Sequence, residues 1–177
     1  THTWKQDGIV TLSAKESSKG DRVVDGQGNA VLSQRLSTGE LVFLAKDVPA
    51  LGSAHFRVMK GAAVQEGGCS VQGTTLENEF LQVRLDEKTG NIVSVQRKGE
   101  AYNYIDTSVD GGANSFAWLP ANKDLPHADT VTAVSVVEKG PLVVELRVDS
   151  KAKGCRSVSR SVRLVSGLPW VEISNTV

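Results

Sequence analysis

The sequence predicts an all-β protein. Short segments rich in β-branched and large apolar residues recur along the chain, and Gly, Asp, Asn and Ser separate them. In the clearest case Leu81, Val83 and Leu85 alternate with polar residues, which places the apolar side chains on one face of a strand. No segment carries a convincing helical pattern. These observations favour β-sandwiches over βαβ units.

The first half is expected to fold as a small β-sandwich over residues 1–62. Its predicted strands are 9–12, 22–25, 31–34, 40–44 and 55–58. Turn-forming residues lie between them at 18–21, 25–29 and 37–40, and the segment 48–52 precedes the last strand.

A change of composition follows. Gly67, Gly68 and Gly73 fall in a stretch with few anchors for a core, so we expect residues 63–74 to be a linker. A second domain is then expected over residues 75–177.

The second domain begins with a predicted hairpin, in which strands 81–85 and 92–95 flank the turn 86–90. Gly90 can adopt the positive φ that such a turn requires. Further strands are expected at 131–137, 142–148, 158–164 and from 170 onward. Arg160 breaks the apolar face of the strand 158–164.

Charge and composition exclude several classes of function. The chain has 177 residues with 20 basic and 20 acidic ones, and no basic stripe is present to bind nucleic acid. No apolar run approaches the roughly 20 residues of a membrane helix, and no signal peptide opens the chain. Thr1 does not resemble a natural start, so we expect a piece of a larger protein. Cys69 and Cys155 are expected to be two buried thiols rather than a disulfide.

Catalytic groups do not converge in the sequence. His2, His55 and His127 are far apart and lack the spacing of metal ligands, although His127 lies in a polar loop where an acid/base or metal role stays open. The loop carboxylates Asp106 and Asp110 are more typical of solvated turns than of a glycosidase pair. No Gly-x-Ser-x-Gly elbow of a serine hydrolase occurs.

The long segment 98–125 is too rich in Gly, Asn and Asp for a helix, and long loops of this kind are often functional. Its aromatic residues are interleaved with asparagines; they are Tyr102, Tyr104, Phe116 and Trp118. Aromatic faces stack on sugar rings and amides bond to hydroxyls, so this combination fits carbohydrate contact. Burial in the core is the alternative, and it is favoured for Phe116 and equally open for Trp118.

The second half resembles a known family. LENEFLQV at 76–83 and DEKTGNIVS at 86–94 are similar to the "LENEFLRV…DPKTGRIVSL" pattern that opens the large C-terminal β-domain of family 38 glycoside hydrolases, the α-mannosidases. EKGPLV at 138–143 and PWVEISNTV at 169–177 resemble later stretches of the same domain.

The first half resembles the preceding small β-domain of that family. VDGQGNAVLSQ at 24–34 is similar to "V.D.QG..VPSQ", and ELVF at 40–43 with VPALG at 48–52 is similar to "ELVF…VPPLG". Thr3-Trp4 resembles the end of "NPLSW". The resemblance covers nearly the whole chain in order.

This resemblance implies a small β-sandwich followed by part of a larger galactose-mutarotase-like β-supersandwich. It also implies that the zinc ion, the nucleophile and the acid/base of the enzyme lie in an N-terminal α/β-barrel that this chain lacks. No catalytic or metal-ligating residue is therefore carried over. The implied partners are that barrel, the remaining β-domain and mannose-containing glycans. The sequence itself indicates no compartment, and an extracytoplasmic location, periplasmic or secreted, rests only on the class of enzyme.

One motif of this resemblance concerns contact with the substrate. SFAWLP at 115–120 resembles the family's "SGAY-(L/I)-F" segment, whose aromatic lines the sugar pocket, although Phe116 replaces Gly and Trp118 replaces Tyr. The candidate carbohydrate contacts are Trp118, Phe116, Asn114 and Asp124. The expected function is that of a non-catalytic β-region of a zinc-dependent retaining α-mannosidase. The alternative is a carbohydrate-binding or purely structural module of another polysaccharide-degrading enzyme.

Overall fold

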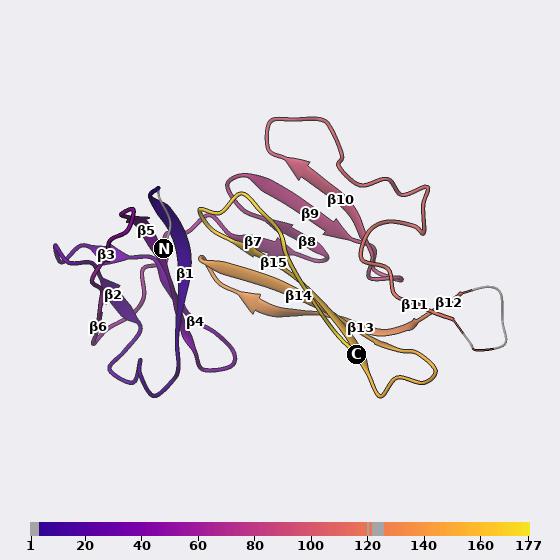
Figure 1. The fold of residues 1–177 in the computed structure, drawn as a ribbon, viewed down its shortest axis with the longest axis horizontal. Coiled ribbons are helices and arrows are strands. Elements are labelled where there is room, and N and C mark those ends of the chain that lie inside the picture. The colour runs from indigo at the N-terminus through magenta and orange to yellow at the C-terminus, as the bar shows by residue number, and fades with distance from the viewer. Residues whose placement is uncertain (1–3, 120, 122–125) are drawn as a thin grey trace.

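The computed structural model describes residues 4–119, 121 and 126–177. Strands, turns and irregular segments account for these residues, with no helix among them, so the predicted all-β class is confirmed (Figure 1). Within the same residues there is accordingly no helix long and apolar enough to cross a membrane.

The first half is a sandwich of two small antiparallel sheets. One contains, in order, β1 (Gln6–Leu12), β5 (Leu41–Val48) and β4 (Ser33–Arg35). The other contains β3 (Ala30–Val31), β2 (Arg22–Val24) and β6 (Arg57–Met59). A cluster of buried side chains from β2 and β5 forms its core: Val23, Leu41, Phe43 and Ala45.

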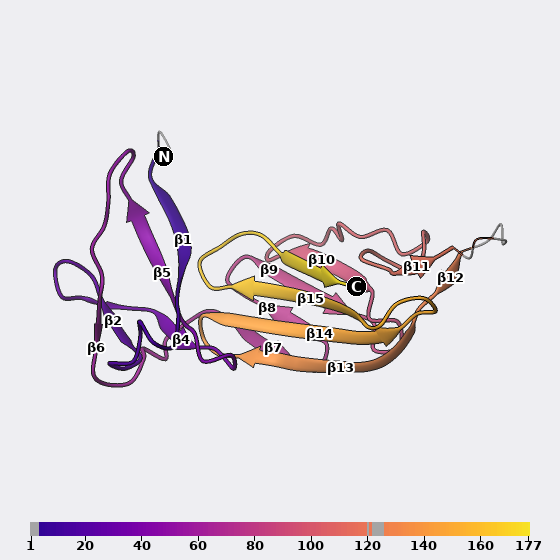
Figure 2. The ribbon, with the colours of Figure 1, turned by 60° about the horizontal axis from the view of Figure 1, so that its bottom comes forward.

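The second half is a larger sandwich of two four-stranded antiparallel sheets, which lie one over the other in Figure 2. One sheet has the order β10 (Ile92–Arg97), β9 (Leu81–Leu85), β8 (Thr75–Glu77), β7 (Ser70–Gln72). The other has the order β13 (Thr130–Lys139), β14 (Val143–Lys151), β15 (Val158–Val165), β16 (Glu172–Thr176). A short hairpin of β11 (Ala117–Trp118) and β12 (His127–Ala128) extends from the end farthest from the first sandwich (Figure 1).

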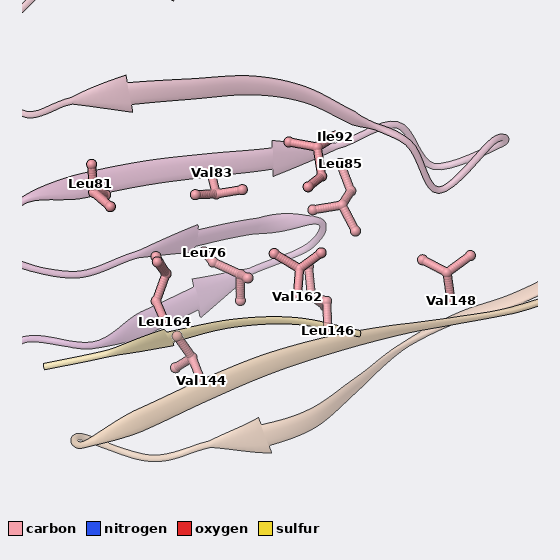
Figure 3. Close-up of a cluster of buried hydrophobic side chains, with 10 residues drawn as sticks. All are labelled: Leu76, Leu81, Val83, Leu85, Ile92, Val144, Leu146, Val148, Val162 and Leu164. Carbon is pink, nitrogen blue, oxygen red and sulfur yellow. The ribbon is translucent and has the colours of Figure 1, made fainter. Parts of the chain in front are cut away.

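The core of the second sandwich consists of aliphatic side chains that point toward one another from the two sheets (Figure 3). Leu76, Leu81, Val83, Leu85 and Ile92 come from one sheet. Val144, Leu146, Val148, Val162 and Leu164 come from the other. The alternation read from the sequence at 81–85 and 142–148 therefore corresponds to inward-facing side chains, because successive residues of a strand point to opposite faces.

Strand β5 is buried on both faces. Leu41, Phe43 and Ala45 face the core of the first sandwich. Val42 and Leu44 belong to a different cluster, together with Leu142, Val143, Val165 and Leu168 of the second sandwich. This explains why its first five residues are apolar without alternation, a pattern typical of strands covered on both sides.

Polar side chains join the two sandwiches beside this shared cluster. The Gln34 Oε1 atom accepts hydrogen bonds from the backbone N–H groups of Leu142 (3.2 Å) and Val143 (2.8 Å). The Gln34 Nε2 atom donates to the Val143 carbonyl at 3.2 Å. A carboxylate oxygen of buried Glu138 accepts bonds from the backbone N–H and the hydroxyl of Ser37, at 2.8 and 2.6 Å. A glutamine side chain thus completes the backbone pairing at the β13–β14 turn.

Two details differ from the prediction. The predicted strand 31–34 is divided at Leu32, with β3 and β4 in different sheets. The predicted linker 63–74 contains β7, which pairs with β8 as the edge strand of the second sandwich. Both segments are too short for periodicity to locate, since a two- or three-residue strand is defined by its partner rather than by its own pattern.

The residues after β8 anchor its turn to the opposite sheet. Asn78 is fully buried, and its Nδ2 atom donates to the carbonyls of Val165 (2.8 Å) and Leu168 (2.9 Å). Its Oδ1 atom accepts from the N–H groups of Phe80 and Leu81. The LENEF segment therefore has a structural role.

Candidate functional site

The long segment after β10 is pinned along the free edge of that strand. Isolated bridges join Gln96 to Asn103 and Ile92 to Ala113. The Asn103 Oδ1 atom accepts a bond from the Val95 N–H at 3.0 Å, and its Nδ2 atom donates to the Val93 carbonyl at 3.1 Å. The predicted loop is therefore an ordered extension of the sheet up to Ala113.

Trp118 lies on β11 and stacks on His127 of β12. The ring centroids are 5.1 Å apart with an interplanar angle of 26°. The antiparallel pairing places these residues directly opposite each other, which brings their side chains to the same face of the hairpin. Trp118 is half-buried and belongs to none of the buried clusters.

Phe116 lines a hollow of about 400 Å³ between the β9–β10 turn, the segment 110–117 and the start of β13. The side chain is half-buried and lies outside the buried clusters. Phe116 is therefore not a core residue, contrary to the interpretation that the sequence favoured. Polar residues around it include Lys88, Asn91, Asp110 and Ser115.

Asn114 has a left-handed backbone conformation, with φ of 57°. Its Oδ1 atom accepts a bond from the Asn175 Nδ2 atom at 2.8 Å, while its own Nδ2 atom is buried and has no hydrogen-bond partner among the described residues. The fourth predicted contact, Asp124, lies outside the described residues. The structure thus places Asn114, Phe116 and Trp118 along one continuous segment.

The other aromatic pair of the loop lies elsewhere. Tyr102 and Tyr104 flank Asn103 beside Val95 and Gln96, and both rings are mostly exposed. They pack edge to face with centroids 5.1 Å apart. The Tyr104 hydroxyl donates to the Glu100 carboxylate at 2.9 Å, and this bond raises the pKa of the phenol.

A buried ion pair next to residues 114–118, called the aromatic segment from here on, was not predicted as part of the site. The Arg160 Nη2 atom lies 3.2 Å from the Asp129 Oδ2 atom, and the two side chains are only 2% and 7% exposed. Burial lowers the pKa of the Arg160 guanidinium, and the Asp129 carboxylate opposes that shift. An arginine remains charged under such a shift, so the pair is ionic. The available signal was the interruption of the apolar face of β15 by a charged residue.

Polar groups and an aromatic ring surround the hollow beside Phe116. Among the described residues, no three His, Cys, Asp or Glu side chains are grouped so that they could hold a metal ion. Asp129 is engaged by Arg160, and the other polar groups that line the hollow beside Phe116 are amides, hydroxyls, the Lys88 ammonium and the Asp110 carboxylate.

A larger hollow of about 670 Å³ lies in the first sandwich, beside the turn at 25–27 and the loop 49–56. Charged or titratable side chains around it are Asp25, Lys46, Asp47 and His55, and its apolar wall includes Leu44 and Phe56. Asp25 bonds within its own turn, to the N–H groups of Gln27 and Asn29. This hollow contains none of the predicted contacts.

Comparison with known proteins identifies the second sandwich. Residues 76–177 match the family described as the glycosyl hydrolases family 38 C-terminal domain. The chain belongs to glycosyl hydrolase family 38. Neither a curated protein nor a solved structure matches the chain. The matched range of this family 38 chain begins in β8 and includes both β9–β10 and the sheet of β13 to β16, so the candidate contacts lie inside the family domain.

Proposed function

We propose that this chain is the non-catalytic C-terminal β-region of a zinc-dependent, retaining α-mannosidase. In this proposal the zinc ion and the reacting carboxylates lie in a separate catalytic barrel, against which the two sandwiches act as a scaffold. Trp118 contributes to the wall of the sugar pocket, with Phe116 and Asn114 beside it. The family match over residues 76–177 carries the proposal.

The placement of Trp118 supports a role in sugar contact. The indole lies on a short hairpin at the free end of the molecule and remains half-buried instead of joining the core. A ring held by stacking on His127 can bind the C–H face of a pyranose with little loss of side-chain freedom.

Catalysis and binding are tested separately. The chain should not hydrolyse a chromogenic α-mannoside, with or without added zinc, and hydrolysis that copurifies with the chain would refute the placement of chemistry elsewhere. In calorimetric titration with methyl α-mannoside, Trp118→Ala should weaken binding by about tenfold or more, equivalent to about 1.4 kcal/mol.

Trp170→Ala is the control, because Trp170 is a tryptophan with an accessible ring (46% exposed) that lies outside the aromatic segment. Its affinity should equal that of the unmutated chain. An unmutated chain without measurable affinity would favour a purely structural module. Equal losses in both variants would argue against a specific role of Trp118.

A further inference from the structure

Arg160 lies on a face of its strand that is otherwise apolar. It lies on the same face of β15 as Val158 and Val162, opposite Val148 of β14. A guanidinium in such a place requires partners for its N–H groups, because an unpaired buried charge is strongly destabilising.

The partners of Arg160 come from separate segments that converge on the aromatic segment. The Nη1 atom donates to the Asn114 carbonyl at 2.6 Å and to the Asn91 Oδ1 atom at 3.0 Å. The Nη2 atom donates to the Thr89 carbonyl at 2.8 Å and to the Asp129 Oδ2 atom at 3.2 Å. One side chain therefore joins the β9–β10 turn, the end of the segment pinned on β10, and the residue that precedes β13.

The backbone held by these bonds has a run of positive φ values. Asp110 and Asn114 have φ values of 51° and 57°, and Gly111 and Gly112 between them also have positive φ. Asn91 bonds the start of this stretch: its Nδ2 atom donates to the Asp110 carbonyl at 3.2 Å. Arg160 bonds the end of the stretch at the Asn114 carbonyl, two residues before Phe116 and four before Trp118. Positive φ is uncommon for residues other than glycine, and at Asp110 and Asn114 it coincides with the bonds from Asn91 and Arg160 to their carbonyls.

We propose that Arg160 is a positioning residue for the sugar-contacting segment 114–118. It does not touch the sugar; it holds the Asn114 carbonyl and thereby sets where Phe116 and Trp118 enter the hairpin. The proposal rests on the proposed function for the sugar-binding part, whereas the positioning itself can be measured without a sugar.

Arg160→Lys is the decisive variant. A lysine retains the charge that pairs with Asp129, but its single ammonium cannot also span the carbonyls of Thr89 and Asn114. In a chain with Trp4→Phe and Trp170→Phe, all tryptophan emission comes from Trp118. We expect the emission maximum to shift and acrylamide quenching to increase about twofold or more as the segment loosens. The dissociation constant for methyl α-mannoside should rise at least about tenfold.

Arg163→Lys is the matched control on the same strand. Arg163 also bonds a carboxylate, with Nε and Nη2 at 2.8 and 2.6 Å from the Glu145 Oε2 atom, but it has no bond to the aromatic segment among those of the described residues. Its Trp118 emission, quenching and sugar affinity should match those of the unmutated protein.

The outcomes separate positioning from stability. A lower unfolding temperature in Arg160→Lys with unchanged Trp118 emission, quenching and affinity would overturn the proposal. If Arg160→Lys does not fold, Asn91→Ala takes its place, because it removes one acceptor of Arg160 and the grip on Asp110. It should loosen Trp118 in the same direction, and unchanged emission would again overturn the proposal. An absence of sugar affinity in the unmutated chain would refute the sugar contact, while the emission measurement still decides the role of Arg160.

Discussion

The Asp86 carboxylate organises the turn between β9 and β10. Its Oδ1 atom accepts bonds from the N–H groups of Lys88 (2.9 Å) and Thr89 (2.8 Å) and from the Thr89 hydroxyl (3.0 Å). These bonds, first of all the one from the Thr89 N–H, lower the pKa of Asp86 in the folded protein. Gly90 closes the turn with φ of 66°, and a Cβ there would collide with Val148.

The first prediction concerns pH. Because the folded pKa of Asp86 is lowered, its contribution to stability is fully present above the unfolded value of about 3.9 and disappears as pH falls through the folded pKa. Asp86→Asn should lower the unfolding temperature at pH 7, and the difference from the unmutated chain should shrink below about pH 4. Thermal unfolding followed by circular dichroism at several pH values tests this. Parallel curves for both chains throughout the range would contradict it.

Cys69 is the second residue whose chemistry depends on its surroundings. Both cysteines are free in the structure, and each is half-buried, whereas fully buried thiols were expected. Burial, with a smaller effect of the Glu79 charge, raises the pKa of the Cys69 thiol to about 12. The Cys69 Sγ atom donates to the Leu142 carbonyl at 3.3 Å.

We therefore predict that Cys69 is unreactive in the folded chain. The thiolate is the nucleophile, so at pH 8 iodoacetamide should modify Cys69 on the order of a thousandfold more slowly in the folded chain than in denaturant. Peptide mass spectrometry over time measures both rates. Similar rates would show that the thiol is accessible and ionised.

Among the elements, β5 determines how the two halves are joined. Its alternate side chains contribute to two cores, with Phe43 in the first sandwich and Leu44 in the cluster shared with the second. A change on either face should therefore affect a different part of the molecule.

Leu44→Ala should destabilise the chain by about 2–5 kcal/mol, since it deletes buried methyl groups and leaves a cavity at the contact between the sandwiches. Leu51→Ala is the matched control; Leu51 is 72% exposed, and its loss should change stability by less than about 0.5 kcal/mol. Urea unfolding gives both values. Equal effects would mean that Leu44 does not support a packed contact.

At the scale of the whole molecule, the sandwiches are joined by the shared cluster and by the buried Gln34 and Glu138. Gly140 permits this approach, because a Cβ at that position would collide with the Gln34 amide. Two segments far apart in the sequence therefore meet where the sandwiches touch, VLSQ at 31–34 and GPL at 140–142. This contact is called the joint below.

Gln34→Leu should weaken this joint while preserving each sandwich. It leaves the N–H groups of Leu142 and Val143 without their acceptor, at a cost of about 1–3 kcal/mol for each group that stays buried. We expect one calorimetric unfolding transition to separate into two. Gln82→Leu is the control, since the Gln82 amide bonds to Glu77 within one sheet. A single unshifted transition in Gln34→Leu would argue against the joint.

The aromatic and asparagine pattern of the long loop predicted the candidate sugar contacts, and their role in binding stays a prediction. Asn114, Phe116 and Trp118 do lie along one segment, but Tyr102 and Tyr104 do not join them, because Asn103 fixes that part beside the other end of β10. The sequence did not predict Arg160 or Asp129 as site residues. Their partners come from segments distant in the chain, and no spacing along the sequence encodes such contacts.

The sequence alone determined the β class, most strands and the family, because these depend on local alternation, turn residues and ordered motifs. The tertiary structure decided what the local pattern could not specify. It set which face of β5 meets which core, and it showed that the predicted linker contributes an edge strand. It also showed that Arg160, which interrupts the apolar face of β15, donates a hydrogen bond to the Asn114 carbonyl of the aromatic segment. The physical reason is that burial of a polar or apolar group depends on partners brought together by folding, not on its neighbours in the chain.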